Sequence, residues 1–175
     1  MTQLFRYALG FAALAGFLIS LAVHVEALMG VDIASSIPSV WLLHAGVFVV
    51  FGPFVFFSRK DFVGNQSLLS MAKGLPPWAA VLGGAIFVYA IVNFALFLLH
   101  SEGGNPTVEN GKYLLMEHGA LIRELTPTEF TALKANELRG FSGHWLLFYF
   151  VPAAYFLFWK PSTLPLSSGL TSKIA

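Results

Sequence analysis

Histidines are the residues of this sequence whose type and positions best support chemistry. The chain holds five of them. His24, His44, His100 and His144 lie in four different apolar stretches, each near the end that an up-and-down chain would place on the same side. His118 lies in the polar segment between the third and fourth stretches. Because imidazole binds protons, metal ions and haem iron near neutral pH, we expect the four histidines of the apolar stretches to form one layer.

Such a layer suits two kinds of bound group. A b-type haem needs two imidazoles on facing helices at similar depth. Three or four imidazoles, with Glu26 or Glu102 nearby, can instead hold Zn, Cu or Fe, and the ligand type does not choose among these metals. We therefore predict a haem b or transition-metal site in a redox or electron-transfer setting. Its predicted ligands are His24, His44, His100 and His144, with Glu26 as a further metal ligand.

A structural interpretation of the same residues stays open, in which the chain binds no cofactor. An imidazole at the headgroup boundary can act as an amphipathic ring, like Tyr or Trp, and a layer of them can also join helices or carry protons. Tyr89 and Asn93 share a predicted helix face with His100, and we expect them to be interhelical hydrogen-bond partners. His118 is expected to be a turn residue.

Several other chemistries are excluded or disfavoured. The chain has no cysteine, which excludes disulfides, thiolate zinc sites and iron–sulfur clusters. Ser142 and His144 are two residues apart, about 160° around a helix, so they do not form a nucleophile–base pair. A His-Glu-x-x-His zinc motif is absent. The sequence leaves open whether the protein is an enzyme.

The elements that must position these residues are membrane helices. A spanning helix needs about 20 mostly apolar residues, and four stretches meet this need, at about 4–29, 39–57, 77–100 and 141–159. The first is longer than a signal-peptide core and no small-x-small cleavage site follows it, so we expect a retained anchor. In this first stretch the small residues Ala12, Gly16 and Ser20 precede His24 at four-residue steps. They predict a seam of small residues along one helix face, which lets a neighbouring helix approach closely.

The distribution of Lys and Arg orients these spans. Six basic residues and the single acid Asp61 fall on the side of both termini, whereas seven acids and four basic residues fall on the other. The positive-inside rule therefore places both termini in the cytoplasm and loop 101–140 outside. We expect an all-α membrane protein whose residues 1–160 form an antiparallel bundle of four transmembrane helices. Residues 101–140 form a small extracytoplasmic cap, and 161–175 a cytoplasmic tail.

The cap has local signals of its own. Residues 113–116 and 120–125 flank Glu117-His118-Gly119, which is typical of a short hairpin. Thr126, Pro127 and Glu129 form a helix start with a capping box. We expect that helix to end near Arg139, with Gly140 separating it from the fourth span.

The architecture resembles that of small four-helix membrane b-type cytochromes. A relay through two stacked haems needs ligands in both halves of the membrane, however, and no histidine lies in the inner half of any predicted span. The function of those cytochromes is therefore not carried over. The alternative to a cofactor-binding protein is a non-catalytic accessory or assembly subunit of a larger membrane complex.

Composition agrees with a membrane location. Apolar residues make up 57% of the 175 residues and charged residues only 11%, less than half of the roughly 25% found in soluble domains. The net charge of +1 gives no basic surface for a nucleic acid. The expected partners are the lipid bilayer and a larger membrane complex.

Overall fold

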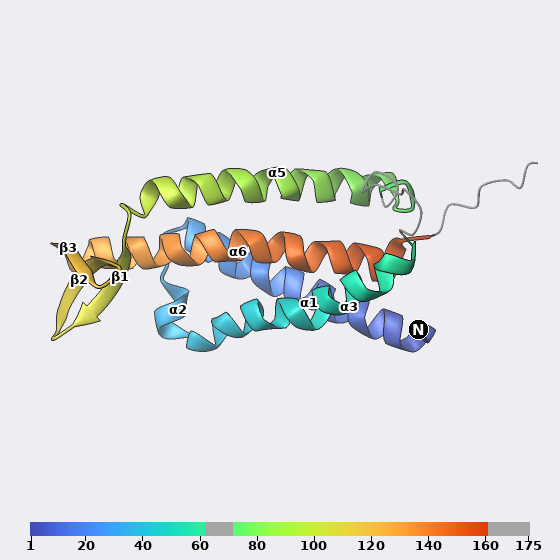
Figure 1. The fold of residues 1–175 in the computed structure, drawn as a ribbon, viewed down its shortest axis with the longest axis horizontal. Helices are drawn as coiled ribbons and strands as arrows, with labels where there is room; N and C mark the ends of the chain where they lie inside the picture. The colour runs from blue at the N-terminus through green and yellow to red at the C-terminus, as the bar shows by residue number, and fades with distance from the viewer. Residues whose placement is uncertain (62–71, 161–175) are drawn as a thin grey trace, which may run out of the picture.

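The computed structural model describes residues 1–61 and 72–160, and this part of the chain is mostly helical. Figure 1 shows long helices lying side by side, with a small sheet at one end. The elements in chain order are α1 (Gln3–Leu28), α2 (Ile33–Ser36), η1 (Pro38–Trp41), α3 (Leu42–Asp61), α5 (Pro77–His100), β1 (Asn105–Glu109), β2 (Lys112–Glu117), β3 (Ala120–Glu124) and α6 (Pro127–Phe158). The predicted tail 161–175 lies outside the described residues.

Four helical segments have the length and hydropathy to span a membrane, as predicted. They are Gln3–Leu28, Pro38–Arg59, Pro77–His100 and Pro127–Phe158. The fourth differs from the prediction, because α6 is one continuous helix and does not break at Gly140. A glycine inside a helix costs only about 1 kcal/mol relative to alanine. Here it also lets the ring of Phe97 on α5 lie where a side chain would otherwise be.

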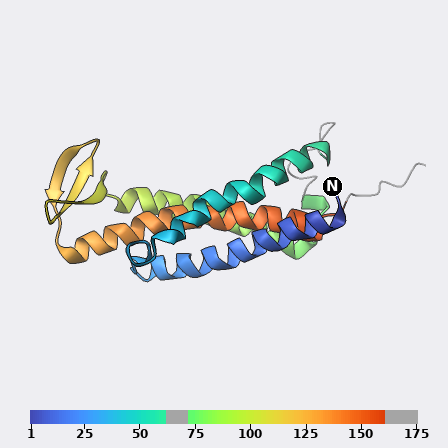
Figure 2. The same ribbon diagram turned by 90° about the horizontal axis from the view of Figure 1, so that it is seen from below.

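The central element is α6, which contacts α1, α3 and α5, while α1 also contacts α3. Figure 1 shows α6 between α5 on one side and the pair α1 and α3 on the other. In Figure 2, α1 and α3 diverge toward the end that carries the N-terminus. Most residues of α6 from Trp145 to Phe156 are buried. The other three long helices therefore take their positions from α6.

Small residues allow α1 to approach α6 closely. Gly16 is buried against the ring of Tyr149, and a side chain at this position would overlap the ring. The predicted seam is correct at Gly16, Ser20 and His24, which are all buried. Its first member is wrong, because Ala12 is exposed and the neighbouring Ala13 is fully buried. The buried positions 13, 16, 20 and 24 follow the mixed three- and four-residue steps of a helix with 3.6 residues per turn.

The cap is a three-stranded antiparallel sheet in the order β1-β2-β3. Two-residue loops connect the strands, Asn110-Gly111 and His118-Gly119, and all four residues have positive φ. Positive φ at both loop positions is typical of the type I′ hairpin. The predicted hairpin of β2 and β3 and the turn position of His118 are confirmed. The strand β1 was not predicted, although Asn110-Gly111 is a strong hairpin signal.

Hydrogen bonds hold both ends of α6. At its start, the hydroxyl of Thr126 accepts from the backbone N–H of Glu129, and the Glu129 carboxylate accepts from the backbone N–H of Thr126, so the predicted capping box is confirmed. At its end, Arg6 of α1 donates to the carbonyl oxygens of Phe156 and Trp159, at 2.8 and 2.7 Å. The last carbonyl groups of a helix lack intrahelical partners. Arg6 supplies a donor to these two oxygens and so links α1 to the end of α6.

Gly143 of α6 provides a test of this packing. A methyl group at Gly143 would overlap the side-chain amide of Asn93 on α5. We expect Gly143→Ala to destabilise the purified protein by about 1–3 kcal/mol, as overpacking of a core does, with a lower Tm in thermal unfolding. The matched control is Gly84→Ala on α5, where no atom lies within 4 Å of the added methyl. A Gly143→Ala protein as stable as Gly84→Ala would contradict the close packing of α5 and α6.

Candidate functional site

His24 joins three helices through hydrogen bonds. Its side chain on α1 is buried, with 2% exposed. Its Nδ1 lies 2.8 Å from Oγ of Ser142 on α6, and its Nε2 lies 2.5 Å from the hydroxyl of Tyr89 on α5. Both ring nitrogens therefore have partners within the chain. In this arrangement no lone pair of His24 is free for a metal ion or for haem iron.

Which group donates in each of these hydrogen bonds follows from the backbone carbonyl at which the series ends. The Ser142 hydroxyl donates to the carbonyl oxygen of Leu138 at 2.7 Å, and a carbonyl oxygen can only accept. The Ser142 oxygen must then accept from His24, which places the ring proton on Nδ1. Nε2 of His24 is left as an acceptor for the Tyr89 hydroxyl. The result is a directed series of hydrogen bonds from α5 through α1 to α6.

The residues predicted to be interhelical partners have that role. Tyr89 bonds to His24, as described, and the side-chain amide of Asn93 donates to the carbonyl oxygen of Arg139 at 3.0 Å. Asn93 is buried, with 2% exposed. Unpaired polar groups are costly in apolar surroundings, so these bonds stabilise the contact of α5 with its neighbours.

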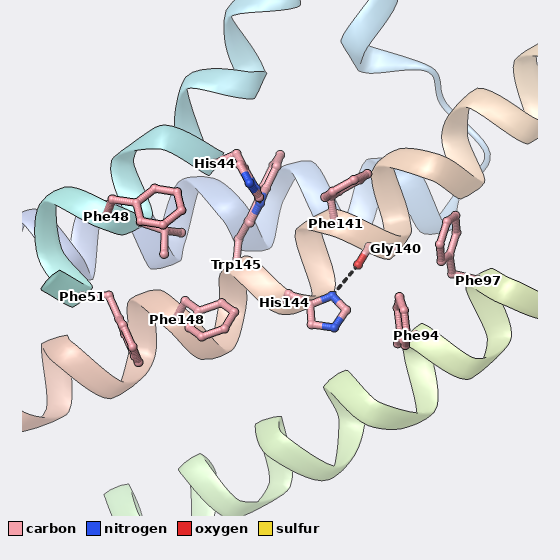
Figure 3. Close-up of a pocket in the computed structure, with 11 residues that line it drawn as sticks. His44, Phe48, Phe51, Phe94, Phe97, Gly140, Phe141, His144, Trp145 and Phe148 are labelled. Atoms are coloured by element: carbon pink, nitrogen blue, oxygen red, sulfur yellow. Dashed lines mark hydrogen bonds between the residues drawn. The ribbon is translucent and has the colours of Figure 1, made fainter. Parts of the chain in front are cut away.

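His44 and His144 line one cavity between α3, α5 and α6, shown in Figure 3. The cavity has a volume of about 420 Å³ and an almost entirely apolar wall. The lining residues are His44, Val47, Phe48, Phe51, Phe94, Phe97, Gly140, Phe141, His144, Trp145 and Phe148. Ligand pockets in proteins commonly measure about 300–1,000 Å³ and are mostly apolar, with a few polar groups that fix orientation. The two imidazoles are the candidates for such groups here, since the indole N–H of Trp145 already donates to His44.

The two imidazoles have opposite hydrogen-bonding roles. Nδ1 of His144 donates to the carbonyl oxygen of Gly140 at 2.8 Å, so its Nε2 carries a lone pair and no proton. Nδ1 of His44 accepts from the indole N–H of Trp145 at 3.1 Å, so the proton of a neutral His44 ring is on Nε2. The remaining ring nitrogen is therefore an acceptor in His144 and a donor in a neutral His44.

Aromatic rings form the walls around these two imidazoles. Phe94 of α5 lies edge-on to His144, with ring centroids 5.0 Å apart, and Phe141 lies edge-on to His44 at 5.7 Å. Figure 3 shows the His144 ring on the side of α6 that faces Phe94. Phe48 is 70% exposed, and Phe141 is 39% exposed. The cavity is therefore bordered by an apolar outer surface of the protein.

His100 belongs to a different environment. It is exposed at the end of α5, and its Nδ1 donates to the carbonyl oxygen of Leu96 at 2.6 Å. It lines a second, more polar cavity of about 300 Å³ with Glu102, Glu129, Asn136 and Arg139. Both acids there pair with Arg123 of β3, which lies 3.0 Å from Glu102 and 2.8 Å from Glu129.

The charge of Glu129 is fixed by its role at the start of α6, outside the apolar part of the helix. The pKa of Glu129 is lowered to about 2. The main cause is that its carboxylate accepts hydrogen bonds from the backbone N–H and from the hydroxyl of Thr126, and the neighbouring Arg123 adds to the effect. The pKa of Arg123 is raised by its hydrogen bonds to Glu102 and Glu129. These side chains thus form an ion-pair network that holds the cap on α6.

The predicted ligands are therefore distributed over three places in the structure. His24 lies in the polar contact between helices, His44 and His144 line the apolar cavity, and His100 lines the polar cavity. No hydrogen bond or ion pair is found between Glu26 and a histidine among the described residues. In residues 1–61 and 72–160, no group of three or more His, Asp or Glu side chains is placed to hold a metal ion. The predicted haem site, which needs two of the four histidines, and the predicted metal site both stay predictions. A metal site that uses all five predicted ligands would require these residues to rearrange.

Comparison with known proteins gives no further guide. No model of a protein family matches the chain, and no curated protein or solved structure resembles it significantly.

The protonation of the ring nitrogens is a direct test of the site. In ¹⁵N NMR of histidine-labelled protein at neutral pH, an imidazole nitrogen without a proton resonates well downfield of one that bears a proton. We expect the unprotonated nitrogen to be Nδ1 in His44 and Nε2 in His144 and His24. Each signal is assigned by its loss in the corresponding His→Asn variant.

Trp145→Phe is the matched control for this measurement, since it removes the donor that fixes the proton of His44. We expect His44 to become a mixture of both tautomers in this variant, while His144 is unchanged. A wild-type His44 with its proton on Nδ1 would contradict the assigned roles.

Proposed function

We propose that the chain spans a membrane four times, with both termini in the cytoplasm and loop 101–140 outside. What supports this is the apolar surface that the helices leave uncovered. On α5 the described structure buries only Ala79, Ala90 and Asn93, while large apolar residues such as Leu99 are exposed by as much as 77%. Soluble monomers rarely expose continuous apolar surface of this extent. The lipid bilayer is the partner that covers it in this proposal.

We further propose that the cavity of His44 and His144 binds a flat, conjugated, redox-active cofactor. The observation that carries this proposal is the pairing of two polar ring nitrogens with a wall of phenylalanine rings in one cavity. Flat conjugated rings pack well against the faces and edges of aromatic side chains, and the nitrogens can fix their orientation. A membrane protein with such a cofactor belongs to a redox or electron-transfer setting.

Haem b is one candidate for this cofactor, and the residues fit it in part. Nε2 of His144 has the free lone pair that an axial ligand of haem iron needs. His44 is not a second ligand while it accepts from Trp145, because its Nε2 then bears a proton. When bound, haem would supply one-electron redox chemistry, and His144 would hold its iron.

An accessory or assembly subunit is the alternative. The observation that favours it is again the uncovered apolar face of α5, which a helix of another subunit can cover as well as lipid can. In that case the cavity would have no ligand of its own, and the cap would serve for docking.

The topology can be tested with single cysteines, since the chain contains none. We expect Glu109→Cys, at the exposed end of β1, to react with a membrane-impermeant maleimide on intact cells. Lys73→Cys, exposed before α5, is the matched control and should react only after permeabilisation. The reverse pattern, or labelling of both positions on intact cells, would contradict the proposed orientation.

Cofactor binding can be tested on detergent-purified full-length protein. It is examined by optical spectroscopy and by mass spectrometry of a solvent extract, and is then titrated with haem b and with a short-tailed hydroquinone. We expect one conjugated molecule to bind, and His144→Phe to weaken its binding at least tenfold, which corresponds to about 1.4 kcal/mol. His100→Asn, in the other cavity, should bind as the wild type does. A protein that binds neither haem nor the hydroquinone would overturn the proposal in favour of the accessory subunit.

A further inference from the structure

We infer that the ligand of the cavity is a hydroquinone-type ring, held between His44 and His144 through its two oxygens. This inference rests on the proposed function, because it identifies the class of flat redox molecule that the cavity takes. It concerns binding of the reduced ring, with one hydroxyl donating to His144 and the other oxygen accepting from His44.

The roles of the two imidazoles select this ligand. His144 presents a lone pair on Nε2, because its Nδ1 donates to Gly140. His44 presents an N–H, because its Nδ1 accepts from Trp145. A hydroquinone has a hydroxyl at each end of the ring, and each hydroxyl can donate or accept. It can therefore satisfy a donor and an acceptor at the same time.

The oxidised ring is a poorer match for the same site. Both of its oxygens are carbonyls, which only accept. One carbonyl can accept from His44, but the other would face the lone pair of His144 without a proton between them. A buried acceptor without a donor costs free energy, so the site should prefer the reduced form.

The charge of the cavity also favours a neutral ring over haem. Haem b carries two propionates, which need cationic or strongly polar partners. Among the described residues that line this cavity, none is Lys or Arg. Ligation of haem by both imidazoles would in addition require His44 to move its proton to Nδ1. That change would leave the indole N–H of Trp145 without its acceptor, although the Trp145 side chain is only 1% exposed.

The position of the cavity suits a ligand with an apolar tail. His44 and Phe48 on α3 are exposed, and Phe141 on α6 is partly exposed, so the cavity lies next to the outer apolar surface. In the proposed orientation this surface faces lipid. A ring that enters from the bilayer can then occupy the cavity while its tail stays among the lipid chains.

The inference can be tested by equilibrium binding of three ligands to the full chain in lipid nanodiscs. They are a decyl-tailed hydroquinone, the corresponding quinone, and the dimethyl ether of the hydroquinone, which keeps the ring but has no O–H donor. For the wild type we expect the hydroquinone to bind about tenfold more tightly than the other two, which corresponds to about 1.4 kcal/mol, because only the hydroquinone can donate a hydrogen bond to His144.

Variants of His144 separate the hydrogen bond from the shape of the cavity. His144→Phe should weaken the hydroquinone about tenfold and leave the ether nearly unchanged. His144→Gln, whose amide oxygen can accept, should restore part of the preference. Circular dichroism and size-exclusion chromatography identify any variant that fails to fold, and the comparison of ligands on the wild type alone then decides.

The outcomes distinguish this inference from the proposed function. An ether that binds the wild type as tightly as the hydroquinone would overturn the inference, because the hydroxyl would then contribute nothing. Binding of haem with a bis-imidazole spectrum, without binding of the hydroquinone, would also overturn it while supporting the proposed function. Failure of every ligand, haem included, would overturn both.

Discussion

Polar groups buried among apolar helices are under one constraint, because an unpaired group is costly there. Among the buried side-chain nitrogen and oxygen atoms of the described residues, only Oγ of Ser20, Nε of Arg139 and Nε1 of Trp159 lack a hydrogen-bond partner. His24, Ser142 and Tyr89 meet this constraint together and join α1, α6 and α5. Arg6 meets it at the opposite end of α6 by bonding to carbonyl oxygens that the helix leaves free. Small residues such as Gly143 then allow the helices to come close enough for these bonds to form.

The same constraint gives the candidate site its chemistry. A backbone carbonyl can only accept and an indole N–H can only donate, so Gly140 and Trp145 decide which nitrogen of each neighbouring imidazole bears the proton. Two histidines that look equivalent in the sequence thereby acquire opposite roles in one cavity. This asymmetry is what distinguishes a ligand with two hydroxyls from a metal ion or a bis-imidazole haem.

Much of the fold could be predicted from the sequence, and the site only in part. Apolar stretches of sufficient length are a direct signal, so the four long helices were found. The continuity of α6 through Gly140 was not, because it depends on the contact with Phe97 of another helix. The sequence singled out the four histidines as one layer, but their separation depends on which helices are neighbours and on which face each ring lies. Trp145, whose indole N–H fixes the proton of His44, was not among the predicted site residues.

Binding of a flat ring in the cavity between α3, α5 and α6 can be mapped by photo-crosslinking. The probe is a decyl-tailed azidoquinone that is reduced in place, and the labelled peptides are then identified by mass spectrometry. We expect labelling of segments 44–51 and 141–148, which line the cavity, and loss of that label when excess unlabelled hydroquinone is present. Labelling confined to α1 or to the outer face of α5, and unaffected by the competitor, would contradict it.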